Sequence, residues 1–376
     1  MSDLAAELDQ LPGEVMARLL DHGFDRARLL RLGAALGRGE IDRGLVTGTM
    51  EPPAPGDVLE LPEPGTSAYR ALEERGEQAL REGRVALIVL AGGMATRMGG
   101  VVKALVEALP GRTFLDIRLA ELDVLERRYG KAPPLWLMTS AATDAGIRAA
   151  LGPRRDGERV ATFTQQLSLR LTREGRLFLD EAGRPSEHAP GHGDLPDALK
   201  ASGLLQRFVD RGGTELLMAN LDNLGASLEP ALVGFHLAHG KDVTTETVDK
   251  VEGDRGGIPV RVDGKLRMLE EFRIPPGFDP ASVRVFGTNT FHVNARALLR
   301  LEMDWRFFAV EKKVGSTPVV QFERIVNEIT DTLSTAYVRL PRTGPRARFL
   351  PVKDPDELER RQGEIETVVR ARGLLP

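Results

Sequence analysis

Residues 85–103 constrain the fold of this chain more than any other segment. They read VALIVLAGGMATRMGGVVK. Six apolar residues come first, and so short a run with no polar position predicts a strand buried on both faces of a parallel α/β sheet. The small residues that follow let backbone N–H groups converge on a phosphate with no Cβ in the way. The segment therefore predicts a strand and a phosphate-binding turn, whose candidate residues are Ala91, Gly92, Gly93, Arg97 and Lys103.

Two common phosphate motifs do not fit this turn. It lacks the GK[ST] ending of a P-loop and the GxGxxG spacing of a dinucleotide-binding fold. A glycine-rich strand-to-helix turn without a ligand is the structural alternative, because glycine punctuates many turns for backbone reasons alone.

Composition excludes several classes of protein. The chain has 376 residues with 41% hydrophobic and 28% charged residues, which fits a soluble globular protein with a full core. Its net charge of −4 gives no global attraction for nucleic acid. There is no cysteine, so disulfides, thiolate nucleophiles and cysteine zinc sites are excluded. The N-terminus lacks the pattern of a signal peptide, and no apolar run approaches the ~20 residues of a membrane span, so a cytoplasmic location is expected.

The order of predicted elements indicates a βαβ unit. Leucines at 115, 119 and 122 share one face of a helix predicted over residues 113–128, and a buried strand follows at residues 135–139. The connection should be right-handed, with the ligand at the carboxyl ends of the strands. Before this unit, the pattern predicts two or three short helices over residues 1–50, a proline-rich strap at 52–64 and a helix over 66–82.

Polar residues follow two further predicted strands. Gln165 ends the strand that begins at residue 160, and its amide could read a uracil edge. Gly191 and His192 lie in the segment APGHGD, which suggests a loop close to a ligand. The structural alternatives are a solvated glutamine and a histidine that only packs.

The strand predicted at residues 214–220 ends in carboxylate and amide groups. It delivers Asn220 and Asp222 to the expected ligand edge of the sheet. Mg²⁺ prefers one or two carboxylates together with substrate phosphate oxygens, so Asp222 is the candidate metal ligand. A helix cap is the structural alternative for this residue.

The second half of the chain reads as hairpins. The pair Asp263-Gly264 predicts a turn between two strands, the second of which ends at Glu270. Asn289 lies inside the apolar strand predicted at 285–293 and needs a partner, such as a sugar hydroxyl. A helix is expected from about residue 318 to 333, after two adjacent lysines. The candidate cations here are Lys312, Lys313 and Lys353, each of which could instead be a solvated surface residue.

Taken together, these stretches resemble the UDP-sugar pyrophosphorylase family of uridylyltransferases. The pieces that carry the resemblance occur in the family's order from about residue 85 to 358: LAGGMATRMGG with its lysine, TFLDI, TFTQ, PGHGD, NLDNLGA, GKLRMLE, FGTNTF, VVQFE and RFLPVKDPDEL. The loop matches the pattern LxGGxGTxxG, with Ala95 where glycine is usual and Val102 where proline is usual.

The resemblance implies a role for each matching position. It implies an α/β fold with a Rossmann-like nucleotidyltransferase domain and a mixed, mostly parallel central sheet. From this chain's own residues we expect a helical N-terminal layer and a short C-terminal tail, without the C-terminal β-helix of the family's eukaryotic members. The implied nucleotide contacts are Ala91, Gly92, Gly93, Gln165, Gly191 and His192. The implied sugar contacts are Asn220, Glu270 and Asn289, and the implied Mg²⁺ ligand is Asp222. The implied catalytic cations are Arg97, Lys103, Lys313 (with Lys312 as the alternative) and Lys353.

The implied reaction joins UTP to a sugar 1-phosphate, giving a UDP-sugar and pyrophosphate. Glucose 1-phosphate is the expected substrate, and the alternatives are N-acetylglucosamine 1-phosphate, galactose 1-phosphate or a non-catalytic relative that binds UDP-sugar. The expected organisation is a helical segment with the strap (1–80), a catalytic domain (81–340) and a short C-terminal segment (341–376). The chain is expected to act as a monomer or small homo-oligomer, without nucleic acid or membrane.

Overall fold

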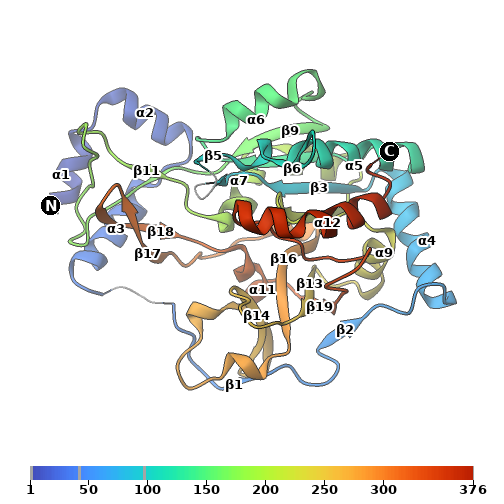
Figure 1. Cartoon of the computed structure of the whole chain (residues 1–376). Helices are drawn as coiled ribbons and strands as arrows, with labels where there is room; N and C mark the ends of the chain where they lie inside the picture. The colour runs from blue at the N-terminus through green and yellow to red at the C-terminus, as the bar shows by residue number, and fades with distance from the viewer. Residues whose placement is uncertain (1–2, 41–43, 96–98, 376) are drawn as a thin grey trace.

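The computed structural model describes residues 3–40, 44–95 and 99–375, and an eight-stranded sheet lies at its centre (Figure 1). In spatial order its strands are β2 (Val58–Glu60), β19 (Thr335–Arg339), β13 (Val243–Asp249), β16 (Val285–Asn294), β12 (Glu215–Asn220), β3 (Val85–Leu90), β8 (Leu135–Thr139) and β9 (Val160–Thr164). Neighbouring strands are parallel, except that β16 runs antiparallel to both β12 and β13. The predicted mixed, mostly parallel sheet is confirmed.

Strand β3 is buried on both faces, as its sequence predicted. Leu87 and Val89 belong to one hydrophobic cluster, and Ala86 and Ile88 belong to the other. This division follows from the two-residue period of a strand, which sends successive side chains to opposite faces. The helices that contribute to the first cluster are α4 (Ser67–Glu82), α5 (Phe114–Tyr129), α6 (Asp144–Leu151), α9 (Pro230–His239) and α12 (Pro355–Ala371). Those of the second are α7 (Leu195–Ala201), α8 (Leu204–Asp210), α10 (Ala295–Arg300) and α11 (Ile329–Thr332).

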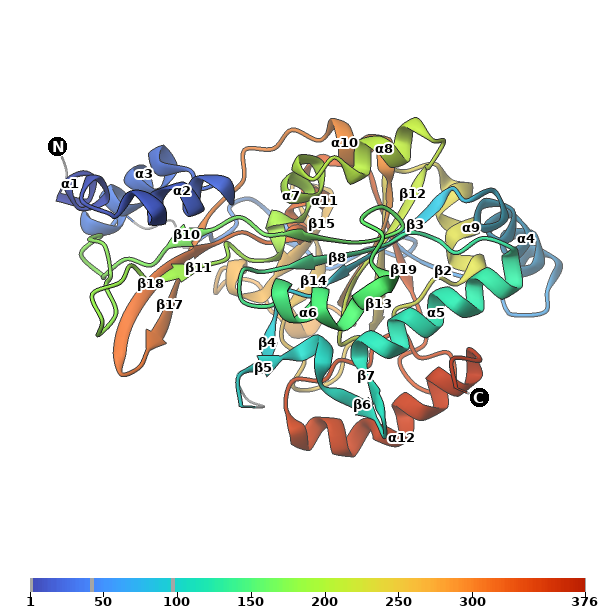
Figure 2. The same cartoon turned by 90° about the horizontal axis from the view of Figure 1, so that it is seen from above.

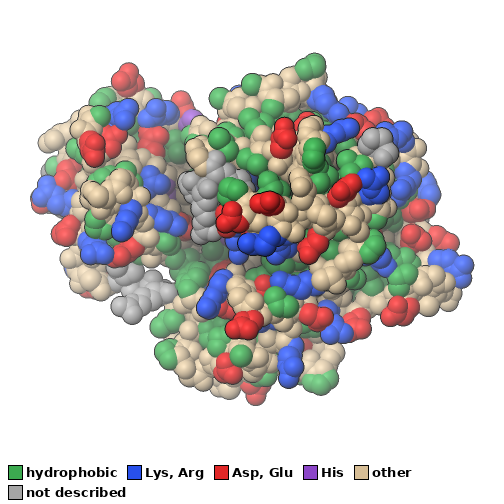
Figure 3. All heavy atoms as spheres, viewed as in Figure 1, with side chains coloured by type: hydrophobic (Ala, Val, Ile, Leu, Met, Phe, Trp, Pro, Cys, Tyr) green, Lys and Arg blue, Asp and Glu red, His purple; other side chains and the backbone are tan. Residues whose placement is uncertain are grey.

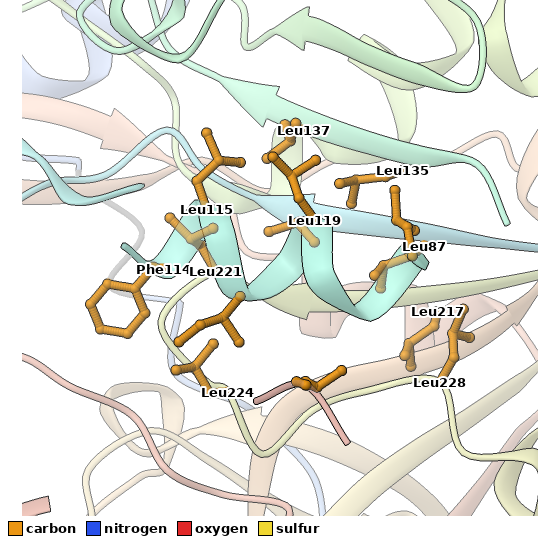
Figure 4. Packing of buried hydrophobic residues seen from close by; sticks show 14 of the residues in the cluster. Leu87, Phe114, Leu115, Leu119, Leu135, Leu137, Leu217, Leu221, Leu224 and Leu228 are labelled. Atoms are coloured by element: carbon orange, nitrogen blue, oxygen red, sulfur yellow. The ribbon is translucent and has the colours of Figure 1, made fainter. Parts of the chain in front are cut away.

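Helix α5 shows how local sequence fixes an element of this core. Thr113 and Asp116 form a reciprocal capping box at its start, and Gly130 ends it in the left-handed conformation with φ 78°. Leu115 and Leu119 pack over β3 and β8 (Figure 4). The predicted βαβ unit is therefore present.

The N-terminal helices α1 (Asp3–Asp9), α2 (Gly13–Asp21) and α3 (Arg26–Gly37) form a lobe beside the sheet (Figures 1 and 2). The strands of this lobe are β10 (Ser168–Leu169), β11 (Glu187–His188), β17 (Phe308–Val314) and β18 (Thr317–Glu323). Leucines of the three helices share a cluster with Leu169, Leu171 and Val320. Helix α4 lies outside the lobe and packs along α9.

The prediction of a helix over residues 318–333 is wrong. Residues Thr317–Glu323 are strand β18, which pairs with β17 across the turn at Gly315, and only Ile329–Thr332 are α-helical. Val320 also exchanges two backbone hydrogen bonds with Leu171, at 2.8 and 2.9 Å. Pairing with the neighbouring β17 and the bridge to the distant Leu171 thus override the local helical spacing. The adjacent β-branched residues Val319 and Val320 also suit a strand.

A three-stranded sheet and two short hairpins complete the structure. Strands β1 (Met50–Glu51), β14 (Gly257–Val262) and β15 (Lys265–Glu270) form a three-stranded sheet. Asp263 and Gly264 both have positive φ at the predicted turn between β14 and β15. The remaining strands are β4 (Met94–Ala95), β5 (Val101–Val102), β6 (Glu107–Leu109) and β7 (Arg112–Thr113). None of the helices in the described ranges combines the length and hydropathy that crossing a bilayer requires.

Candidate active site

Two cavities meet where β3, β8, β9 and β12 end. The first, of about 590 Å³, is lined by the turn after β3 and is called the glycine-loop cavity here. The second, of about 470 Å³, lies against β15 and β16 and is called the hairpin cavity. His192, Asn220 and Asp222 line both. This is the carboxyl edge at which open α/β sheets bind their ligands.

The glycine-loop cavity brings together the predicted nucleotide contacts. The nucleotide contacts that line it are Ala91, Gly92, Gly93, Gln165, Gly191 and His192, and the predicted catalytic Lys103 lines it as well. Ser140 and Thr143, which follow β8, donate hydrogen bonds to the carbonyls of Gly92 and Ala91 at 2.9 and 3.1 Å. The sequence analysis missed these two anchors, although hydroxyl residues directly after a predicted strand could have indicated them.

Gln165 is fixed between two glycines. Its side-chain Nε2 donates to the carbonyl of Gly191 at 2.7 Å, and its Oε1 lies so close to Gly92 that any Cβ there would collide with it. Gly191 itself has φ 89°, a conformation that favours glycine. Gln165 is only 7% exposed, so the alternative of a solvated glutamine is excluded.

A buried ion pair that the sequence analysis missed fixes the part of the site around Gln165 and Gly191. Arg324 and Asp194 are each at most 1% exposed and form a charge-assisted contact, and Asp194 also accepts the backbone N–H of Gln166. The pair therefore ties β18 and the segment 191–194 to the residue next to Gln165. Because the two charges are 130 residues apart in the chain, local sequence gave no sign of the pairing.

His192 is a neutral hydrogen-bond donor at the junction of the cavities. Its Nδ1 accepts the backbone N–H of Val326 at 3.0 Å, which leaves the ring proton on Nε2. Burial lowers the pKa of His192 to about 4. The ring therefore carries no charge at neutral pH.

Lys103 and Asp222 form the central charged contact of the site. The Nζ of Lys103 lies 2.5 Å from Oδ2 of Asp222, and the two side chains are 19% and 17% exposed. Asp222 follows β12 and does not cap a helix, since α9 begins at Pro230 with Glu229 at its N-cap. The capping alternative for Asp222 is therefore excluded.

Asn289 has a strained backbone and an unsatisfied side chain. It has φ 56° inside strand β16, where a left-handed residue is rare. Its Nδ2 donates to Oδ1 of Asn220 at 3.0 Å, while its own buried Oδ1 finds no hydrogen-bond partner among the described residues. Strain of this kind occurs mainly at functional sites, and a buried acceptor without a partner is suited to a ligand hydroxyl.

Glu270 lines the hairpin cavity with Asn289 and Lys353. Its Oε1 accepts from Nδ2 of Asn327 at 2.6 Å. Burial, helped by the charge of Glu271 and opposed by Arg273, raises the pKa of Glu270 to about 7. The carboxyl group can therefore donate or accept a hydrogen bond near neutral pH. Further cations of this cavity that the sequence analysis missed are Arg255, Arg342 and Arg361.

The structure separates the two adjacent lysines. Lys312 lines the glycine-loop cavity and lies 3.4 Å from Glu323, whereas the described linings of both cavities leave out Lys313. The reason is the two-residue period of strand β17, which turns neighbouring side chains to opposite faces. This geometry favours Lys312, the predicted alternative, and which of the two lysines acts on a substrate stays a prediction. Arg97, the remaining predicted cation, lies outside the described residues.

The donor set fits a magnesium ion only if phosphate oxygens complete it. Within the described ranges no group of three His, Cys, Asp or Glu residues could hold a metal by itself. Asp222 offers one carboxylate where the two cavities meet. One carboxylate with substrate phosphates is an arrangement that Mg²⁺ accepts.

The fold and the paired cavities define a nucleotidyltransferase-type α/β protein. A sequence model of the UTP–glucose-1-phosphate uridylyltransferase family matches residues 51–364, so this chain belongs to that family. The UTP–glucose-1-phosphate uridylyltransferase of Saccharomyces cerevisiae is 28% identical over 322 residues, which cover 80% of this chain and 64% of that protein. The chain thus spans slightly less than two thirds of this relative's length.

Solved structures show the same fold. A UDP-glucose phosphorylase from Trypanosoma brucei matches with a TM-score of 0.76 at 22% identity, covering 95% of this chain and 78% of that one. A uridine diphosphate N-acetylglucosamine pyrophosphorylase from the same organism matches with a TM-score of 0.71 at 20% identity, covering 99% and 84%. Because proteins named for two different sugars share the fold, the fold alone does not select the sugar.

Proposed function

We propose that this chain is a uridylyltransferase that makes UDP-glucose and pyrophosphate from UTP and glucose 1-phosphate. The observation that carries the proposal is the junction of two cavities at Asp222, with Lys103 against it. UTP would occupy the glycine-loop cavity, where the Gln165 amide faces the base. Glucose 1-phosphate would occupy the hairpin cavity. Glucose is chosen because the matched family and the yeast relative are named for it.

The reaction is an in-line displacement. An oxygen of the sugar phosphate forms a bond to the α-phosphorus of UTP, and the bond from that phosphorus to the bridging oxygen of pyrophosphate breaks. The described site needs no protein nucleophile for this step, and the chain has no cysteine. Catalysis of this kind consists of positioning and electrostatic stabilisation.

The side chains divide this work between the two substrates. Lys103 and Lys312 offset the charge of the UTP phosphates, and Lys353 offsets that of the sugar phosphate. Asp222 would hold Mg²⁺, which would supply further positive charge to the phosphates. The neutral His192 would donate a hydrogen bond from Nε2 to a substrate without adding charge. Glu270 and the free Oδ1 of Asn289 would bind sugar hydroxyls. A cytoplasmic location remains a prediction.

The test is pyrophosphate release from UTP and a panel of sugar 1-phosphates in the presence of Mg²⁺. We expect turnover with glucose 1-phosphate at a kcat/KM at least ten-fold above that for N-acetylglucosamine 1-phosphate and galactose 1-phosphate. A preference for either of the other sugars would overturn the assignment of glucose. UDP-glucose binding with no turnover of any sugar would establish the non-catalytic alternative instead.

A further inference from the structure

The segment that carries Asp222 is buried although it has no regular secondary structure. It connects β12 to α9 over residues 221–229. Leu224 and Ala226 are at most 2% exposed. Leu221, Leu224 and Leu228 pack beside α5 (Figure 4). Buried backbone without secondary structure must find hydrogen-bond partners elsewhere.

Arg118 of α5 supplies partners to three carbonyls of this region. It is 1% exposed and donates to the carbonyls of Ala226 at 2.5 Å, Asn223 at 2.7 Å and Asn220 at 3.2 Å. These carbonyls flank Asp222 on both sides. Glu121 balances the charge, because its Oε2 accepts from Arg118 at 3.2 Å and its Oε1 accepts the N–H of Leu228 at 2.9 Å.

Arg372, just after α12, binds the carbonyls that Arg118 leaves. It donates to the carbonyl of Leu224 at 2.6 Å and to that of Gly225 at 2.7 Å. Two guanidinium groups from distant parts of the chain therefore serve the carbonyls of residues 220 and 223–226. In both cases the acceptors on the segment are backbone atoms, so the arginines fix the path of the chain itself.

We propose that Arg118 and Arg372 are positioning residues for the proposed metal ligand Asp222, together called the arginine clamp. The inference rests on the proposed function and extends it to residues that touch neither substrate. A guanidinium group is planar and permanently charged, and its fork of donors can hold two carbonyls at once, which a lysine cannot do. Groups that orient a metal ligand commonly contribute 10–100-fold to metal affinity.

The clamp predicts a defect that a merely structural role would not produce. We compare Arg118→Lys and Arg372→Lys with two controls, Arg127→Lys and Arg370→Lys, which change exposed arginines of α5 and α12. Mn²⁺ affinity is measured by water-proton relaxation in the presence of UDP-glucose, so no turnover is needed. We expect each clamp variant to bind Mn²⁺ about 10-fold more weakly or worse, with the two controls within two-fold of the parent chain.

Hydrogen exchange gives the second measurement. Amides of residues 221–227 should exchange at least ten-fold faster in the clamp variants, while amides of β3 keep their parent rates. Equal acceleration in β3 would mean general destabilisation and would overturn the proposal, as would unchanged Mn²⁺ affinity. If Arg118→Lys does not fold, Arg372→Lys decides alone, because Arg372 donates its hydrogen bonds to backbone carbonyls and holds no buried carboxylate among the described residues.

The two hypotheses fail in different ways. If the parent chain binds Mn²⁺ with UDP-glucose but releases no pyrophosphate, the proposed function fails and the clamp is still tested by affinity and exchange. If the parent chain turns over and the clamp variants match the controls, only the clamp fails.

Discussion

Lys103 lies against the one carboxylate that both cavities share. Its Nζ is 2.5 Å from Asp222, so a cation is already placed where two polyanionic substrates would meet. At short range and low exposure such a charge is screened little by salt. Lys103 should therefore stabilise the charge that develops at the phosphates in the transition state more than it stabilises initial substrate binding.

Lys103→Ala should lower kcat by at least about 100-fold, the usual cost of removing one preorganised donor from a developing charge. Steady-state kinetics with saturating UTP and glucose 1-phosphate measure the effect. A thermal melt near that of the parent chain is the control for folding. An unchanged kcat would contradict the catalytic role of Lys103.

Glu270 should make the stability of the protein depend on pH. Its folded pKa of about 7 lies above the ordinary value of 4.5, so the native state holds a proton that the unfolded chain has lost. The free energy of unfolding should therefore fall as pH rises from about 4.5 to about 7, by about 1–3 kcal/mol, and level off above that range.

Glu270→Gln keeps the acceptor for Asn327 and should flatten this slope in urea unfolding at a series of pH values. Part of the slope should persist, because burial also raises the pKa of Glu328 to about 7. Glu359→Gln, at an exposed position of α12, is the control and should leave the slope unchanged. A slope that is equally steep in Glu270→Gln would contradict the assignment.

At the scale of elements, the β17–β18 hairpin joins the N-terminal lobe to the glycine-loop cavity. Val320 and Phe322 enter the hydrophobic cluster of α1–α3, while Lys312, Gln321 and Glu323 line the cavity. The alternation along two strands thus gives the hairpin one face for packing and one for the ligand. A helix over residues 318–333 would have dispersed these side chains around its axis.

The hairpin geometry predicts that the two adjacent lysines differ. Lys312→Ala should lower kcat/KM for UTP at least ten-fold more than Lys313→Ala, because only the Lys312 side chain lines the cavity. Paired kinetic measurements at one ionic strength test this, and each variant is the other's control for the loss of one surface charge. A larger effect of Lys313→Ala would contradict this prediction and would mean that the Lys313 side chain points into the cavity in the active state.

At the scale of the whole molecule, the site is assembled from segments spread between residues 90 and 361. The glycine loop, the segments after β9 and β12, the hairpin β14–β15 and the start of α12 all contribute to the two cavities. Lys and Arg side chains gather near the first turns of α12 in the space-filling view (Figure 3). Ligands that bridge these parts should therefore stabilise the whole fold and not one segment.

UDP-glucose with Mg²⁺ should raise the free energy of unfolding by about 2.7 kcal/mol when the nucleotide sugar is at 100 times its Kd, as mass action requires. Scanning calorimetry measures the shift, and repeating the scan with EDTA tests the metal. EDTA should remove most of the shift, because Mg²⁺ held jointly by Asp222 and the phosphates would strengthen binding of UDP-glucose. ADP-glucose is the control, and an equal shift with ADP-glucose would contradict base reading by Gln165.

Sequence determined the parts of this protein that depend on short-range pattern. The buried run of β3, the capping box and terminal glycine of α5 and the Asp263-Gly264 turn each carry their cause within a few residues. The matching motifs also indicated many of the residues that line the cavities, because those motifs sit at strand ends that a parallel sheet brings to one edge.

Only the tertiary structure decided what depends on partners far along the chain. It made residues 317–323 a strand, paired along its length with β17 and bridged to the distant Leu171. It turned Lys312 rather than Lys313 toward the glycine-loop cavity. It also buried Arg118 and Arg324 against acceptors more than 100 residues away. Such contacts are favourable only once the chain has folded and excluded water from them, so no local pattern of residues records them.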